Sequence, residues 1–202
     1  MSTDTQVHPW PPLDAVCEPL FFDAVSSVPA TKAKQLETSR CPKAEAVRLV
    51  RAWHSRLPNT QDGPWVAAYW ATFGGVIYAV ALWNNPSARE LPNDWLELRR
   101  MACAPYAPFN TPSRFLGAMS RHIRATMPGV MKLISYQDTA VHCGTIYKAS
   151  NWTPEFQTKP QYRDRSCVRV GTNRLYRKDI NSADVAASPK VRWALLLREA
   201  AS

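Results

Sequence analysis

The sequence predicts an α/β fold in which helices flank a mixed, strongly curved central sheet. Two apolar runs joined by Gly74-Gly75 predict an antiparallel hairpin, because two glycines accept the positive φ angles of a tight turn. Further along, a strand, a helix and a second strand follow one another, which predicts a parallel pair joined by a crossover helix. The 202 residues, 46% hydrophobic and 20% charged, are enough for one domain with one core.

The N-terminal part of the sequence predicts an irregular arm followed by a helix. Prolines punctuate residues 1–33 and predict an irregular, proline-rich arm, so residues 34–202 are expected to form the single domain. An extended segment is expected from Lys34 to Arg40. Pro42 then suits the first turn of a helix that runs to about Arg56, with Val47 and Val50 on its apolar stripe.

The middle of the chain alternates strands with one long helix. The expected strands are Trp65–Phe73, Val76–Asn84 and Trp95–Cys103. Asn110 or Thr111 can cap the helix that follows, with Pro112 at its first position. Apolar residues then recur every four positions until Pro128-Gly129, namely Phe115, Met119 and Ile123.

The last part of the chain predicts shorter elements. A buried strand is expected over Val130–Tyr136, ending in Gln137-Asp138, and a short helix over Gly144–Asn151. Two short β candidates, Cys167–Val170 and Arg174–Arg177, precede a closing run, Val191–Leu197.

The formal net charge of +9 is concentrated in two segments. Residues 97–132 hold six basic and one acidic residue, and residues 151–202 hold ten and five. Such stretches attract a polyanion, either DNA or RNA or the phosphates of a smaller ligand, although a solvated basic surface gives the same pattern. No apolar run reaches the roughly 20 residues of a membrane span, and the N-terminus lacks the features of a secretory signal. A cytoplasmic protein with no membrane partner is therefore expected, with its five cysteines reduced.

Two places in the predicted fold concentrate polar chemistry. Residues 109–114 lie where a strand ends and a helix begins, so free N–H groups, the helix dipole and Arg114 favour an anion there; an ordinary capped helix is the alternative. At the end of the next strand, Asp138, His142 and Cys143 lie close together in the sequence. Asp138 and His142 can form an acid/base pair or belong to a metal site, or they can serve only as surface and turn hydrogen-bonding groups.

The order of motifs resembles that of a known family. The resemblance rests on five segments, namely Trp53–Pro58, Leu96–Met101, Asn110–Leu116, Ile134–Asp138 and Gly144–Trp152. Together they resemble a GNAT-type acyltransferase and, more narrowly, the phage Mom family of adenine-modifying (methylcarbamoylating) proteins. The resemblance covers about residues 36–197, including the basic stretch Ser188–Trp193.

The resemblance implies a GNAT-like fold and an acyl-CoA, acetyl-CoA or another, in the splay between two parallel strands. The pyrophosphate would lie at the N-terminus of the connecting helix, and the residues implied for the cofactor are Met101, Asn110, Thr111, Ser113 and Arg114. The glycine-rich pyrophosphate loop usual in such proteins is absent. The hydroxyls of Thr111 and Ser113, together with Arg114, would therefore bind the pyrophosphate in place of some of the backbone amides.

The resemblance also implies site residues for catalysis. Tyr147 stands where such folds often keep a phenol that protonates the departing thiolate, although it also suits a core tyrosine. Attack on a thioester carbonyl does not give a product joined through a methylene carbon, so Asp138, His142 or His54 can instead bind a metal ion or position another donor. Asp138 and Tyr147 are expected in one pocket, opposite Ser113.

The first functional hypothesis is transfer of a carbamoylmethyl or acyl-type group to the N6 amine of adenine in double-stranded DNA, which protects phage DNA from restriction. A GNAT acyltransferase acting on an amine of a small molecule or protein is the second, and a non-catalytic nucleic-acid-binding module is the third. Six basic side chains are candidates for phosphate contacts: Arg99, Arg100, Arg121, Arg124, Lys190 and Arg192. The donor and the oligomeric state are left open.

Overall fold

The computed structural model describes residues 29–54, 60–140, 142–158 and 189–199. The β candidates Cys167–Val170 and Arg174–Arg177, and nearly all of the arm expected over residues 1–33, lie outside these ranges. In chain order the elements are η2 (Ala33–Gln35), β1 (Glu37–Arg40), α1 (Lys43–Trp53), β2 (Ala67–Phe73), β3 (Val76–Asn84), β4 (Trp95–Cys103), α2 (Thr111–Thr126), β5 (Lys132–Asp138), α3 (Thr145–Lys148), β6 (Thr153–Gln157) and β7 (Lys190–Leu196).

The strands form one seven-stranded sheet in the order β1-β2-β3-β4-β5-β7-β6. The pair β4 and β5 is parallel, and α2 is the crossover between them; the neighbours on either side are antiparallel. The predicted mixed sheet is therefore confirmed. The hairpin is confirmed as well, because Gly74 and Gly75 adopt φ angles of 55° and 79° between β2 and β3.

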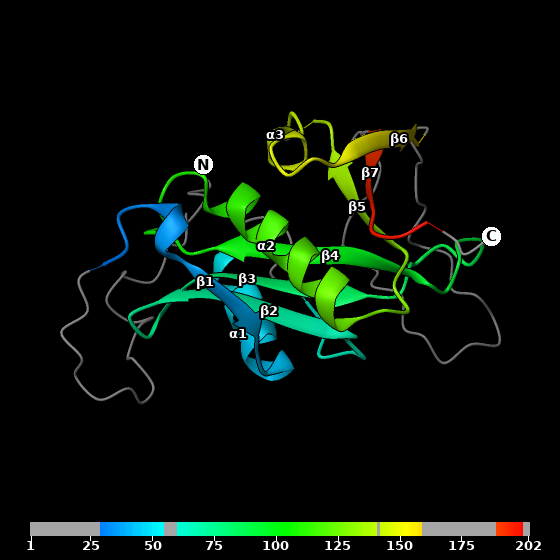
Figure 1. Cartoon of the computed structure of the whole chain (residues 1–202). Coiled ribbons are helices and arrows are strands. Elements are labelled where there is room, and N and C mark those ends of the chain that lie inside the picture. The colour runs from blue at the N-terminus through cyan, green and yellow to red at the C-terminus, as the bar shows by residue number, and fades with distance from the viewer. Residues whose placement is uncertain (1–28, 55–59, 141, 159–188, 200–202) are drawn as a thin grey trace, which may run out of the picture.

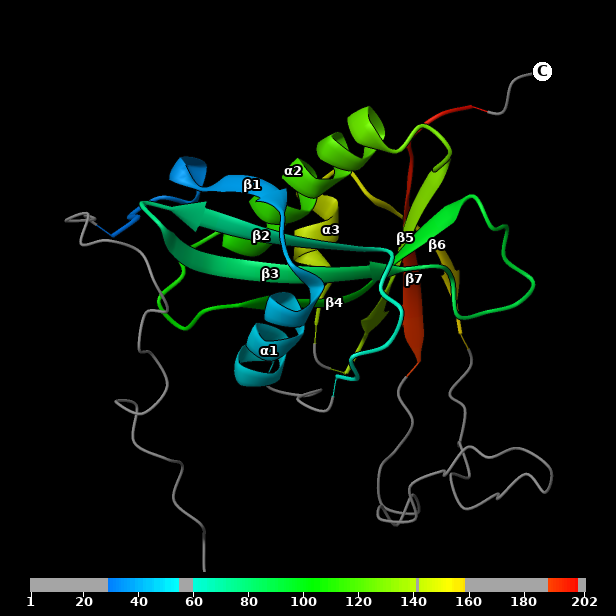
Figure 2. The same cartoon turned by 90° about the horizontal axis from the view of Figure 1, so that it is seen from below.

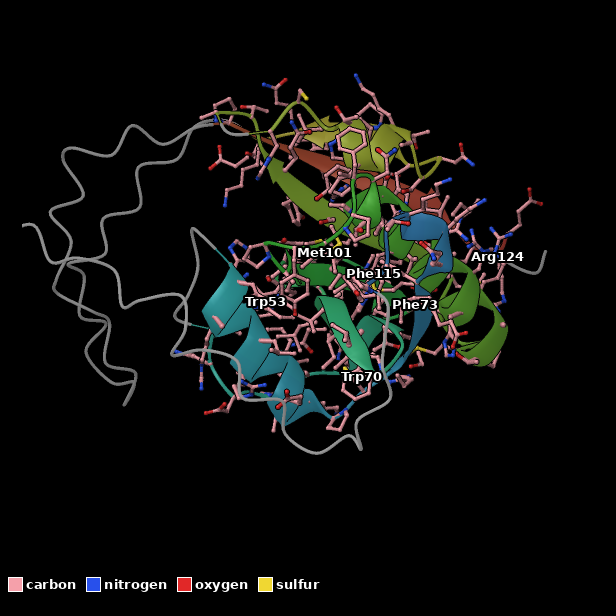
Figure 3. All side chains as sticks on the ribbon, turned by 90° about the vertical axis from the view of Figure 1, so that its left-hand side faces the viewer. Trp53, Trp70, Phe73, Met101, Phe115 and Arg124 are labelled. Carbon is pink, nitrogen blue, oxygen red and sulfur yellow. The ribbon has the colours of Figure 1, made fainter. Side chains whose placement is uncertain are left out.

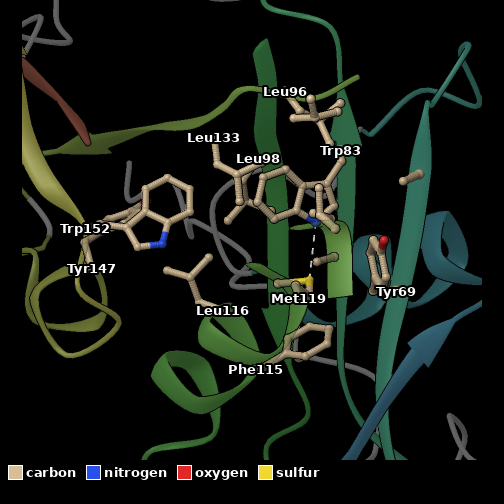
Figure 4. Packing of buried hydrophobic residues seen from close by; sticks show 14 of the residues in the cluster. Tyr69, Trp83, Leu96, Leu98, Phe115, Leu116, Met119, Leu133, Tyr147 and Trp152 are labelled. Carbon is tan, nitrogen blue, oxygen red and sulfur yellow. Dashed lines mark hydrogen bonds between the residues drawn. The ribbon is translucent and has the colours of Figure 1, made fainter. Parts of the chain in front are cut away.

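The two long helices cover opposite faces of the sheet (Figures 1 and 2). The buried side of α1 packs with Val80 and Leu82 on one face. On the other face, Phe115, Leu116 and Met119 of α2 pack around Trp83, whose indole N–H donates to Met119 Sδ at 3.3 Å (Figure 4). Each fully buried apolar side chain contributes about 1.5–3 kcal/mol, so these two layers hold the fold together.

Several expected boundaries differ from those observed. The segment from Lys34 begins in a 3-10 turn before it becomes β1, α1 ends at Trp53 rather than near Arg56, and β5 starts at Lys132. The edge strand β6 was not expected. It contains Pro154 and all five of its residues are exposed, so it offers neither the apolar alternation nor the unbroken donors that predict a strand.

The parallel strands β4 and β5 separate after a short paired stretch. Trp95 to Leu98 pair with Lys132 to Ser135, but β4 continues to Cys103 and β5 to Asp138. In the same place β4 contains a bulge against β3, because Trp83 and Leu82 are consecutive whereas their partners, Leu98 and Arg100, are not. The sheet thus opens into a fork, bounded on one side by the bulge at Arg99.

Candidate active site

The buried phenol of Tyr147 reaches the point where the fork opens. Its hydroxyl lies 2.9 Å from Ser135 Oγ, and Ser135 Oγ donates to Leu98 O at 3.2 Å. Because serine has one hydroxyl proton, which goes to Leu98 O, the phenol is the donor to Ser135. The two hydrogen bonds thus connect α3 to β5 and β5 to β4 at Leu98 and Ser135, the last pair of residues between β4 and β5. Burial raises the pKa of Tyr147, more than the bond to Ser135 lowers it, so the phenol is protonated at neutral pH.

Two side chains from the sheet fix the ring of Tyr147. The Trp193 indole stacks on it, with 5.3 Å between ring centroids and 9° between planes. The indole N–H donates to Gln137 Oε1 at 2.6 Å, and Gln137 Nε2 donates to the backbone carbonyl of His142. Gln137 therefore links the Trp193 platform to the turn that leads into α3. Figure 4 shows Trp152 beside Tyr147 on the core side of this arrangement.

Gly144 makes the close approach possible. Its φ angle is +77°, and a Cβ there would lie 2.5 Å from Trp193 Cζ2 and 2.7 Å from Gln137 Oε1. Both the left-handed backbone and the missing side chain are thus needed directly before α3. Ser135, Gln137 and Trp193 were not predicted as site residues. The available signal was the two-residue spacing of Ser135 and Gln137 on one strand, which places both on the same face.

Asp138 and Tyr147, expected in one pocket, make different hydrogen bonds. The pairing of β5 with β7 is regular up to Asp138, so side chains alternate between faces along it. Ser135 and Gln137 face Tyr147, and Asp138 therefore lies on the opposite face, where its carboxylate accepts the Ala140 N–H at 3.0 Å in a turn. The alternation does not favour a pocket shared by Asp138 and Tyr147, and the shared pocket stays a prediction.

Two further candidate site residues are histidines, His142 and His54. His142 is exposed, and its backbone N–H donates to Asp138 O. His54 follows α1, on the side of the sheet away from α2. Within the part of the chain that the structure describes, no three His, Cys, Asp or Glu side chains are placed to share a metal ion. Asp138, His142 and Cys143 thus do not form such a group in the described structure, and a role for Asp138 or His142 at a metal ion stays a prediction.

The start of α2 only partly fits the expected phosphate site. Asn110 precedes the helix with a φ angle of 67° and makes no side-chain capping bond. Thr111 is fully buried and its hydroxyl donates to Pro108 O, while the Ser113 hydroxyl donates to Asn110 O. Both hydroxyls are thus used within the protein. Arg114 remains exposed at this end, with one N–H donated to Lys34 O at 3.3 Å.

A basic groove runs along the outer side of α2. It has a volume of about 940 Å³ and is lined by residues 31–34, by α2 and the two residues before it, by residues 149–151, and by Leu195 and Leu197. We call this the α2 groove. Five of its lining residues are cations and none is acidic; the cations are Lys32, Lys34, Arg114, Arg121 and Arg124. Figure 3 shows Arg124 on α2, away from Met101 and Phe115.

The other predicted phosphate contacts are already engaged within the protein, except Lys190. Arg99 lies 3.6 Å from Glu97, and Arg100 donates to the bulge carbonyl, Arg99 O, at 2.6 Å. Burial lowers the pKa of Arg100, and the neighbouring Arg99 lowers it further. Arg192 lies 3.4 Å from Glu155 and over the Trp95 ring. Lys190 is exposed.

Met101, expected at the cofactor, lies on β4 beyond the bulge and packs partly buried against the main core. Residues of β4 before the bulge, such as Leu98, face the same core. The extra residue at Arg99 restores this orientation and leaves Met101 on the Tyr147 side of the sheet.

None of the helices in the described parts of the chain is long and apolar enough to cross a membrane.

Comparisons with known proteins agree on the fold. The putative acetyltransferase from Salmonella typhimurium, solved with its cofactor acetyl-CoA, has a TM-score of 0.55 and 11% identity, over 83% of this chain and 97% of that one. Ribosomal-protein-S18-alanine N-acetyltransferase from Escherichia coli has a TM-score of 0.54 and 13% identity, over 82% and 96%. The N-acetyltransferase from Staphylococcus aureus Mu50 has a TM-score of 0.52 and 14% identity, over 81% of this chain and 99% of that one. The chain has the GNAT-like fold predicted from its sequence.

The sequence comparisons add a narrower match. The model of the Mom protein family matches residues 35–188. No curated protein matches the chain.

Proposed function

This chain belongs to the Mom protein family, and from that premise we propose that it is a transferase that uses an acyl-CoA and modifies the N6 amine of adenine in DNA. The observation that carries the proposal is the buried Tyr147 hydroxyl at the fork of β4 and β5. A phenol held there by Ser135 and Trp193 is suited to proton transfer, not merely to filling the core.

Tyr147 would act as an acid. The phenol is protonated at physiological pH, as an ordinary tyrosine also is, and burial raises its pKa further, so a proton is available to a leaving thiolate. The proton points at Ser135 in this structure, so donation to another atom requires the hydroxyl to turn. The stacked Trp193 holds the ring during that rotation, and only the O–H direction changes.

The cofactor residues are proposed with one change from the sequence-based set. Arg114, Asn110 and Ser113 remain at the start of α2, where an exposed guanidinium and the helix N-terminus suit a pyrophosphate. Thr111 is removed, because its side chain is buried and bonded to Pro108 O. An acyl-CoA supplies the activated acyl group when bound, and Met101 would form part of the apolar wall at the fork.

Adenine places a further demand on the protein. The lone pair of N6 is delocalised into the ring, and a base inside a duplex must leave the stack before it can be modified. Aromatic platforms are therefore required. Trp83, Trp152 and Trp193 are buried and belong to the core, whereas Phe109 and Phe156 are exposed and remain available.

The proposal is tested by mass spectrometry of digested DNA from bacteria that express the full chain. We expect a modified deoxyadenosine that is absent from cells with the empty vector and strongly reduced with Tyr147→Phe. Tyr136→Phe is the matched control, since Tyr136 lies on the opposite face of β5. Unmodified DNA in cells that contain the folded protein would contradict the proposal. Acylation of a small-molecule or protein amine by that protein would then favour the second hypothesis.

A further inference from the structure

We propose that residues 13–28 bind to an aromatic surface on the α1 side of the sheet of the same chain, with Leu20, Phe21 and Phe22 as the apolar contact. We call this the Tyr106 surface, and it is formed by Trp53, Ile77 and Tyr106. The contact is independent of the proposed function, because the Mom family model matches only from residue 35 and so does not include this segment.

The Tyr106 surface is held together by edge-to-face ring contacts. The Tyr106 ring lies 6.4 Å from the Trp53 ring, with 82° between planes, and 5.5 Å from the Tyr78 ring, with 79° between planes. The Tyr106 hydroxyl donates to Ile77 O at 3.0 Å. Tyr78 is buried, whereas Tyr106 is 50% exposed and Trp53 is half-buried at the end of α1 (Figure 3). A fixed, exposed aromatic surface of this kind is suited to binding another apolar group.

The described part of the chain begins beside this surface. The buried Ala30 donates its backbone N–H to the Tyr78 hydroxyl at 2.8 Å, and the Tyr78 ring contacts Tyr106. Phe22 precedes Ala30 by eight residues, which span at most about 29 Å at 3.3–3.6 Å per residue. Leu20, Phe21 and Phe22 can therefore reach the Tyr106 surface. A tether this short gives an effective concentration of the order of mM, so a weak contact is enough.

Charge favours this segment over a second copy of the chain as the occupant. Residues 1–28 contain four acidic residues and no lysine or arginine; the acidic residues are Asp4, Asp14, Glu18 and Asp23. All 25 basic residues therefore lie in residues 29–202, with 12 acidic ones, which gives that part a formal charge of +13. Opposite charge attracts the segment to the rest of the chain, whereas two copies that each carry +9 repel one another.

The sequence of the segment suits an apolar contact. Leu20, Phe21 and Phe22 are consecutive, and Pro19 precedes them directly. Two phenylalanines supply a large apolar area at one point of the chain. The proline ring restricts the backbone next to them, so less conformational entropy is lost when the segment binds.

The direct test is photo-crosslinking in the full chain, with Phe21→p-benzoylphenylalanine as the probe. We expect crosslinks within one chain to peptides that contain Trp53, Ile77 or Tyr106, mapped by mass spectrometry. Val7→p-benzoylphenylalanine is the control, since Val7 lies outside the proposed segment, and it should give at least fivefold fewer of these crosslinks. Crosslinks mainly to another surface, or mainly between two copies, would overturn the proposal.

A labelled peptide of residues 13–28 tests the surface itself. The full chain with Phe21→Ser/Phe22→Ser should bind this peptide at least fivefold more tightly than the unaltered chain, whose own segment competes for the surface. Adding Tyr106→Ala to that variant should weaken the binding at least fivefold. Leu196→Ser is the matched control, because Leu196 is 53% exposed on β7, and it should stay within about twofold. Thermal unfolding checks that each variant is folded.

Equal binding of the peptide by the unaltered chain and by Phe21→Ser/Phe22→Ser would overturn the intramolecular contact. An effect of Leu196→Ser equal to that of Tyr106→Ala would overturn the location.

Altered peptides separate the apolar contact from charge. Asp14→Asn/Glu18→Gln/Asp23→Asn should weaken binding at 0.05 M salt and make little difference at 0.5 M, where exposed charges are screened. Leu20→Ser/Phe21→Ser/Phe22→Ser should weaken binding at both salt concentrations. A peptide of the same composition in scrambled order that binds equally tightly would overturn the proposal, since any acidic chain would then suffice.

Discussion

The side chain of Tyr147 points into the core, whereas the residues that follow α3 line the open α2 groove. The Tyr147 region is neutral, and its polar atoms are held by Ser135, Gln137 and Trp193. The groove is exposed, and its cations form no ion pairs within the described residues. One short segment of chain thus joins a neutral, hydrogen-bonded region and a groove lined by cations.

The difference between the two regions predicts different responses. A buried hydrogen-bonded network depends on single atoms and little on salt, because water and ions are excluded from it. A row of exposed cations acts additively and weakens as salt rises. Substitutions in each region should therefore be distinguishable by size, by additivity and by salt dependence.

The largest effect is expected from Tyr147→Phe. Loss of a positioned general acid should lower the rate of modification by roughly a hundredfold or more. The ring and its stack on Trp193 remain, so the free energy of unfolding should fall by no more than about 1–2 kcal/mol. Modified deoxyadenosine per total deoxyadenosine, followed over time in cells, measures the rate. Full modification by a folded variant would leave Tyr147 as a core residue only.

Gly144→Ala should mainly destabilise the protein. The new Cβ would meet Trp193 and Gln137, and the backbone has a positive φ angle, so we expect a loss of about 2–4 kcal/mol in chemical denaturation. Gly129→Ala is the control, because no atom lies within 4 Å of a Cβ built there. A loss for Gly144→Ala no greater than that of the control would show that the turn before α3 does not require a glycine.

Alkaline pH should lower the stability of the folded protein through two of its cysteines. Burial raises the pKa of Cys41 and of Cys103 to about 12 from 9.0, so the folded protein keeps both thiols protonated where the unfolded chain loses them. Their contribution to stability is complete below pH 9 and is lost as the pH rises from 9 toward 12. Urea denaturation between pH 8 and pH 11 should show this decline. The double variant Cys41→Ala/Cys103→Ala should show a shallower one, and an identical slope would contradict the assignment.

The smallest effect is expected on the face of β5 and β7 away from Tyr147. Asp138→Asn and Lys190→Glu/Arg192→Glu should each change modification by less than about threefold, since Asp138 caps a turn and Arg192 is paired with Glu155. Modification levels are measured side by side with those of Tyr147→Phe. A hundredfold loss from Asp138→Asn would return this carboxylate to the active site.

Local patterns predicted most of the fold. The glycine pair fixed the hairpin, and the four-residue repeat of Phe115, Met119 and Ile123 fixed α2. Such patterns failed for β6, where Pro154 interrupts an exposed edge strand. They also failed for the α2 groove, because its four lining segments are separated in sequence and only the tertiary fold brings Lys32 and Lys34 beside Arg114.

Some of the site residues were likewise predicted from the sequence, and others are brought together only by the tertiary fold. Tyr147 was predicted through its family resemblance, and Arg121 and Arg124 through the basic segment that contains them. Asp138 was expected beside Tyr147 because a turn and a helix after the strand end can fold Tyr147 back over it; the alternation along β5 places Asp138 and Ser135, the partner of Tyr147, on opposite faces, and the shared pocket stays a prediction. Trp193 was not predicted as a partner of Gln137, because only the insertion of β7 between β5 and β6 makes them neighbours.

That insertion has a consequence for the order of folding. Gln137 and Trp193 are 56 residues apart in the chain, and synthesis from the N-terminus makes β5, α3 and β6 before β7. Contacts between distant residues form late, because a long loop must close first. A nascent chain that has completed α3 therefore has the phenol of Tyr147 without its stacking partner, and we expect the Tyr147 ring to become rigid only when the last strand enters the sheet.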